Sequence, residues 1–141
     1  MLRIVLKVSS PMFVLVGCLH LILGLHAEVL LGANIGPDTI NNAVLDSQNR
    51  FYGVAFSVYG FLLYICATDL ERYQTVLRTL LWVFFAAGCA RLVSIPLYGM
   101  PTSLVLALLA VELIAPPLLI VWLSSTLNEN LPSTQGNGVD A

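Results

Sequence analysis

The chain has 141 residues, of which 58% are hydrophobic and only 10% are charged. A soluble domain of this length could not bury that much apolar surface, so a water-soluble fold is excluded. The formal net charge of −2, with no basic cluster, also argues against nucleic-acid binding, because phosphate recognition needs several Lys or Arg side chains on one face.

The apolar residues are gathered into four long stretches, each close to the ~20 residues that cross a hydrocarbon core of about 30 Å. Backbone polar groups in lipid must be satisfied within the chain, so each stretch is expected to be a helix. The sequence therefore predicts an all-α fold, an integral membrane four-helix bundle that forms one domain over residues 1–123. The predicted spans are residues 8–31, 51–68, 76–96 and 103–123.

The first stretch follows Arg3 and Lys7, as the apolar region of a signal peptide would. It is longer than such a region, and Leu25-His26-Ala27 is a poor cleavage site. We expect a retained helix. Arg72 and Arg78 flank the second connection. The positive-inside rule then places the N-terminus, the second connection and the C-terminus in the cytoplasm.

The segments outside the spans are polar. The first connection, residues 32–50, carries Gly-Pro-Asp and Asn-Asn signals that favour turns, and it is expected to face outward. Residues 124–141 show no apolar period and are expected to form a flexible cytoplasmic tail.

Small and polar residues repeat at helical spacing in the first two spans, which predicts two stripes that face the bundle interior rather than lipid. The stripes are Gly17, His20, Gly24 and Glu28 in the first helix and Arg50, Gly53, Ser57, Gly60 and Tyr64 in the second.

Arg91 and Glu112 are the charged residues expected deep in the third and fourth spans, roughly 8 and 14 Å from the outward surface. Each would cost at least about 2.5–3.5 kcal/mol in lipid if unpaired, so we expect an ion pair. Two interpretations stay open, namely a structural pair that sets the helix register and a ligand or proton site.

Other polar residues approach the same outward half, which predicts a polar cavity open to that side. His20 could also be a structural histidine, and residues 46–53 could serve as a helix N-cap with Tyr52 as an interfacial anchor. We assign no catalytic residue, metal ligand or cofactor, because the three cysteines lack zinc spacing and a haem would need a second axial ligand. The candidate ligand-binding residues are His20, Glu28, Asp46, Arg50, Tyr52, Arg91 and Glu112.

Four motifs carry a resemblance. They are the Gly-x-x-His-x-x-x-Gly pattern from Gly17 to Gly24, the run from Leu45 to Gly53, the Gly-x-x-Arg segment that ends at Arg91, and the late Glu112. Together they resemble a bacterial family of small four-span membrane proteins known as a domain of unknown function. The likeness covers about residues 5–123. It implies a four-helix fold in the bacterial inner (plasma) membrane and assigns no catalytic role.

Three functions are compatible with these features. The first expectation is a non-enzymatic protein whose outward cavity binds a lipid-like or amphipathic small molecule, with Arg50 and Arg91 meeting an anionic head group. The second is an accessory structural subunit of a larger membrane complex, or a homo-oligomer. The third is a membrane enzyme acting on an isoprenoid or sterol-like substrate, with Glu112 as acid/base. The expected partners are accordingly membrane lipids, a hydrophobic small molecule or other membrane proteins.

Overall fold

The computed structural model describes residues 1–129, where it contains helices and no strand. Four of the helices are long and apolar enough to cross a membrane, so the predicted all-α, four-helix architecture is confirmed. Two short helices lie between the first two long ones. The elements are α1 (Leu2–Leu23), α2 (His26–Leu30), α3 (Pro37–Ile40), α4 (Ala43–Thr68), α5 (Gln74–Tyr98) and α6 (Ser103–Glu129).

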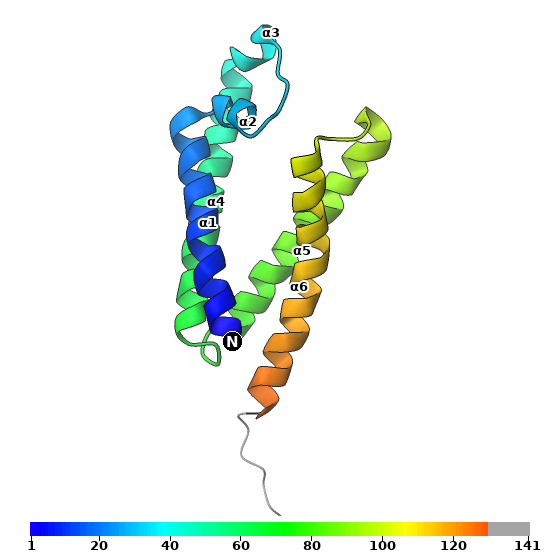
Figure 1. Cartoon of the computed structure of the whole chain (residues 1–141). Coiled ribbons are helices and arrows are strands. Elements are labelled where there is room, and N and C mark those ends of the chain that lie inside the picture. The colour runs from blue at the N-terminus through cyan, green and yellow to red at the C-terminus, as the bar shows by residue number, and fades with distance from the viewer. Residues whose placement is uncertain (130–141) are drawn as a thin grey trace, which may run out of the picture.

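The long helices are arranged as two antiparallel hairpins (Figure 1). Helix α1 packs along α4, and α5 packs along α6, whereas contacts between the two hairpins are sparse. Figure 1 shows that the hairpins lie together near the N-terminus and diverge toward α2 and α3. We call these the N-terminal end and the α2–α3 end of the molecule.

The hydrophobic core lies at the N-terminal end, where all four long helices contribute to it. An aromatic cluster of Phe13, Tyr59 and Phe84 continues the core between α1, α4 and α5. The Tyr59 hydroxyl donates a hydrogen bond to the Leu80 carbonyl at 3.0 Å, which ties α4 to α5. The buried core residues are Leu2, Leu6, Leu63, Cys66, Ala67, Leu70, Leu77, Leu81 and Leu123.

Within the first hairpin, glycines let the α1 and α4 backbones come close together. A Cβ atom on Gly53 would lie 2.5 Å from the Leu21 nitrogen and 2.7 Å from the Gly17 carbonyl oxygen. About two turns away, Ser10 Oγ donates to the Gly60 carbonyl at 2.7 Å. These contacts confirm the packing role predicted for Gly17, Gly53 and Gly60. Arg50 and Tyr64, at the two ends of the second stripe, are exposed.

The first long helix is shorter than the predicted span of residues 8–31. Helix α1 ends at Leu23 because Gly24 adopts a positive φ of 57°, and the chain turns before α2 begins. A glycine favours that conformation because it carries no Cβ. A Cβ on Gly24 would also overlap the Asp46 carboxylate.

The other long helices also differ from their predicted bounds, and α1 begins at Leu2 rather than at residue 8. Helix α5 covers Gln74–Tyr98 rather than residues 76–96. Helix α4 begins at Ala43 rather than at residue 51, because Asn42 Oδ1 accepts the backbone N–H groups of Val44 and Leu45. The cap predicted within residues 46–53 therefore lies inside the helix. Helix α6 continues to Glu129, so the start of the predicted flexible tail is helical. The rest of that tail, residues 130–141, lies outside the described residues.

The α1–α4 contact makes a prediction about stability. Gly53→Ala places a methyl group against backbone atoms that cannot rotate away, so we expect a cost of about 1–3 kcal/mol and a lower midpoint of thermal unfolding in detergent. Gly36→Ala is the matched control, since a Cβ there meets no atom within 4 Å. Equal midpoints for the two variants would contradict the backbone contact.

Candidate functional site

The structure divides the seven candidate residues between the two hairpins. His20, Glu28, Asp46 and Arg50 gather where α1, α2 and α4 meet, whereas Arg91 and Glu112 lie on α5 and α6. Tyr52 is exposed on α4 and its ring contacts only that of the neighbouring Phe51 among the described aromatic pairs. The candidates therefore form two separate clusters instead of lining one common cavity.

Arg50 is engaged by the end of α1. Its Nη1 donates to the carbonyl oxygens of Leu21 and Ile22 at 2.8 and 3.0 Å, and its Nε donates to Asp46 Oδ2 at 2.8 Å. The last carbonyl groups of a helix lack partners within the helix and carry partial negative charge. Arg50 thus caps the C-terminus of α1 from the neighbouring helix.

Asp46 holds the turn between α1 and α2. Its Oδ2 accepts from Arg50, and its Oδ1 accepts the backbone N–H of Leu25 at 3.0 Å. The carboxylate fills the space that a side chain on Gly24 would need. Asp46, Arg50 and the glycine turn therefore form one structural unit that fixes where α2 begins.

His20 and Glu28 form a contact that depends on this turn. In one continuous helix they would be separated by about 12 Å along the axis. The break at Gly24 instead brings His20 Nε2 to 3.5 Å from Glu28 Oε1. His20 Nδ1 lies 2.8 Å from the Val16 carbonyl oxygen, so both ring nitrogens lie close to a polar atom.

Arg91 and Glu112 form the predicted ion pair between α5 and α6. Arg91 Nε lies 3.1 Å from Glu112 Oε1 and 3.0 Å from Oε2. The Glu112 side chain is 5% exposed and that of Arg91 is 38% exposed. Gly88 makes room for the pair, because a Cβ on it would lie 2.9 Å from the Glu112 Cβ. The carboxylate is thus buried below a guanidinium that reaches the surface.

A pocket of about 280 Å³ opens next to Arg91, at the turn between α5 and α6. Of the seven candidates, only Arg91 lines it. The other lining residues are hydroxyl-bearing and apolar side chains from α5, α6 and the turn between them. Sequence patterns along a single helix could not show that these residues share a pocket. They are Ser94, Ile95, Tyr98, Gly99, Met100, Pro101, Val105 and Leu109.

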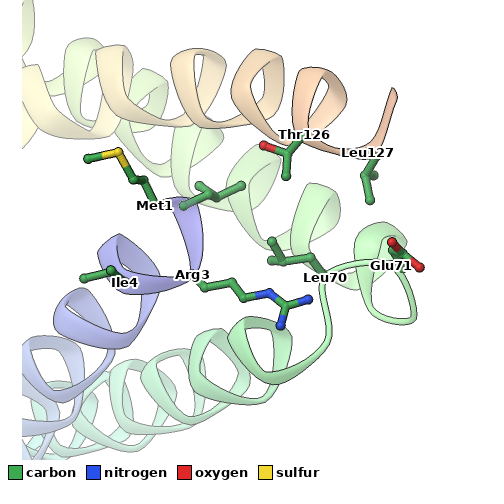
Figure 2. Close-up of a pocket in the computed structure, with 8 residues that line it drawn as sticks. Met1, Arg3, Ile4, Leu70, Glu71, Thr126 and Leu127 are labelled. Atoms are coloured by element: carbon green, nitrogen blue, oxygen red, sulfur yellow. The ribbon is translucent and has the colours of Figure 1, made fainter. Parts of the chain in front are cut away.

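A second pocket, of about 310 Å³, lies at the N-terminal end between the start of α1, the α4–α5 connection and the end of α6. Figure 2 shows the Arg3 side chain extending between α1 and the α4–α5 connection, with Leu70 and Glu71 beside it and Thr126 and Leu127 on the opposite wall. Within residues 1–129, no three His, Cys, Asp or Glu residues gather closely enough to hold a metal ion.

Four long apolar helices in two hairpins, each with a buried polar contact, define a multi-span α-helical protein. The chain belongs to the family described as Domain of unknown function (DUF4345), whose family model matches residues 1–123. Comparisons with curated proteins and with solved structures gave no match. The resemblance to a domain-of-unknown-function family that the sequence suggested is therefore confirmed.

Because the Glu112 carboxylate is buried, replacing Arg91 alone should lower the stability of the protein more than replacing both members of the ion pair. Arg91→Ala leaves Glu112 charged and unpaired, so we expect a loss of about 3 kcal/mol, at the lower end for buried pairs because Arg91 is partly exposed. The double variant Arg91→Gln with Glu112→Gln removes both charges and should recover most of the thermal midpoint. A double variant no more stable than Arg91→Ala would show that the pair is not coupled.

The contacts of Asp46 predict that its loss loosens the turn between α1 and α2 and leaves the rest of the fold intact. Asp46→Ala removes the acceptor for the Leu25 N–H and one partner of Arg50, so hydrogen exchange should rise in residues 24–31. Asp38→Ala, an exposed carboxylate on α3, provides the control and should leave exchange there unchanged. Unaltered exchange in Asp46→Ala would mean that the turn is held by other contacts.

Proposed function

We propose that this protein binds an amphipathic, lipid-like molecule of the bacterial inner membrane, with an anionic head group in the α5–α6 pocket. The observation that carries the proposal is that Arg91 lines a pocket while its hydrogen bond to Glu112 is made by Nε. With the cytoplasmic termini expected from the basic residues, this pocket faces outward.

The donors of Arg91 support this choice of ligand. Glu112 lies against the Nε, and the Nη groups have no hydrogen-bond partner among residues 1–129. Arginine presents a planar set of donors that matches the oxygen atoms of a carboxylate or phosphate. Ser94 and Tyr98 add hydroxyl groups to the same pocket wall. These groups suit an oxygen-rich head group better than a purely apolar ligand.

The rest of the pocket suits the beginning of a hydrocarbon chain. Ile95, Val105 and Leu109 provide an apolar wall next to the polar groups. A volume of about 280 Å³ is near the lower limit for ligand pockets, so it accommodates a head group and leaves a long chain outside. Leu104 and Leu108 of α6 are exposed nearby along the helix and would contact such a chain.

Arg50 is not part of this proposal. Its Nε and Nη1 are used by Asp46 and by the end of α1, so its contacts favour a structural role. The enzyme alternative has no comparable support, because Glu112 is buried, its Oε1 accepts from Arg91 Nε, and it lines neither of the two pockets described.

A second candidate, a subunit of a larger membrane complex or an oligomer, is favoured by one face of α5. Ala86, Ala87 and Ala90 are exposed, whereas Gly88 is already used against α6. Small side chains allow close helix packing in membranes, so this face suits a partner helix.

Native mass spectrometry of protein extracted gently from its own membrane tests the proposal. Ser94→Leu fills part of the pocket while keeping both members of the ion pair, and should reduce the amount of co-purified small molecule at least about fivefold. Ser125→Leu is the control, since Ser125 is exposed near the other end of the hairpin. Equal retention by both variants would refute the pocket, and a stoichiometric protein partner with no small molecule would favour the second candidate.

A further inference from the structure

Arg78, near the start of α5, is a partly buried cation with few partners. Its Nη2 donates to Ser124 Oγ on α6 at 3.1 Å. The Ser124 hydroxyl in turn donates to the Ile120 carbonyl at 3.0 Å, so its oxygen is free to accept from arginine. The Arg78 Nε is fully buried and has no hydrogen-bond partner among the described residues.

Arg78 differs from Arg50 and Arg91, which lie in long helices and have carboxylate partners. Arg50 is paired with Asp46, and Arg91 is paired with Glu112. None of the three ion pairs among the described side chains involves Arg78. A partly buried cation without an opposite charge is costly, and the cost falls when an anion supplies that charge.

The position of Arg78 indicates where such an anion would come from. Helix α5 has 25 residues and is therefore about 37 Å long, more than the roughly 30 Å of a hydrocarbon core. Arg78 lies about one turn from its start, at the depth where lipid phosphates meet the hydrocarbon. Arg91 is about 20 Å further along the axis. The two arginines therefore face opposite leaflets.

We propose that Arg78 and Ser124 form an anion site that binds the phosphate group of an anionic membrane lipid. Ser124 anchors one side of the guanidinium, and the remaining N–H donors face phosphate oxygens. Arg78 keeps partial exposure, so a head group in the surrounding leaflet can approach it. This site is independent of the Arg91 pocket in both residues and position.

The test is a titration of delipidated full-length protein in detergent, followed by native mass spectrometry. Phosphatidylglycerol, phosphatidylcholine and inorganic phosphate are added separately. The unaltered protein should bind phosphatidylglycerol in preference to phosphatidylcholine, and Arg78→Gln should reduce that preference at least about tenfold. Arg78→Lys keeps the charge but loses the planar donor set, so it should fall between the two.

Arg72→Gln is the matched control, because Arg72 is exposed and lies over the Tyr73 ring. It should leave the preference for phosphatidylglycerol unchanged. If Arg78→Gln does not fold, Ser124→Ala removes the anchoring oxygen instead and should weaken binding several-fold. Equal losses in the Arg78 and Arg72 variants overturn the site. Arg78-dependent binding of inorganic phosphate without a lipid preference overturns the lipid source and assigns the site to soluble phosphate.

Discussion

The close contact between the α1 and α4 backbones is the constraint on which the first hairpin depends. Between membrane helices the hydrophobic effect provides little attraction, so association requires close packing and hydrogen bonds. Gly17 and Gly53 provide the packing, and Ser10 provides a hydrogen bond to the opposite backbone. Once this register is set, the end of α1 lies beside Arg50 on α4, and the turn that follows can be capped from outside its own helix.

The second hairpin also uses a glycine for close helix packing, and adds an ion pair between its two helices. Gly88 allows α6 to approach, and Arg91, one turn later, reaches Glu112 on the facing helix. In the first hairpin Gly17 is likewise followed one turn later by a buried polar residue, His20, which contacts Glu28. Each hairpin therefore places a small residue for close packing immediately before a polar pair, although the pairs differ in chemistry and in the helices that they join.

The four long helices and the Arg91–Glu112 ion pair could be predicted from residue types alone. Apolar length predicted four helices, and the scarcity of charge at depth left Arg91 and Glu112 as obvious partners. The turn at Gly24 could not be predicted, because a glycine within an apolar run looks the same whether it packs or turns. The capping role of Arg50 and the separation of the two polar clusters also escaped prediction, since both depend on which helices pair along their whole length. Charge patterns along single helices contain no such information.

The restriction of the shared core to the N-terminal end has a mechanical consequence. The hairpins are joined there by apolar packing and by the bond from Tyr59 to Leu80, while the rest of each hairpin is internally braced. The aromatic cluster lies at the edge of this shared packing, and about 21 Å of α5 extends from Phe84 to Tyr98. Each degree of rotation about that packing would move the tip of the second hairpin by about 0.4 Å. Small repacking around Phe13 and Phe84 is thus amplified into a large change of spacing at the opposite membrane face.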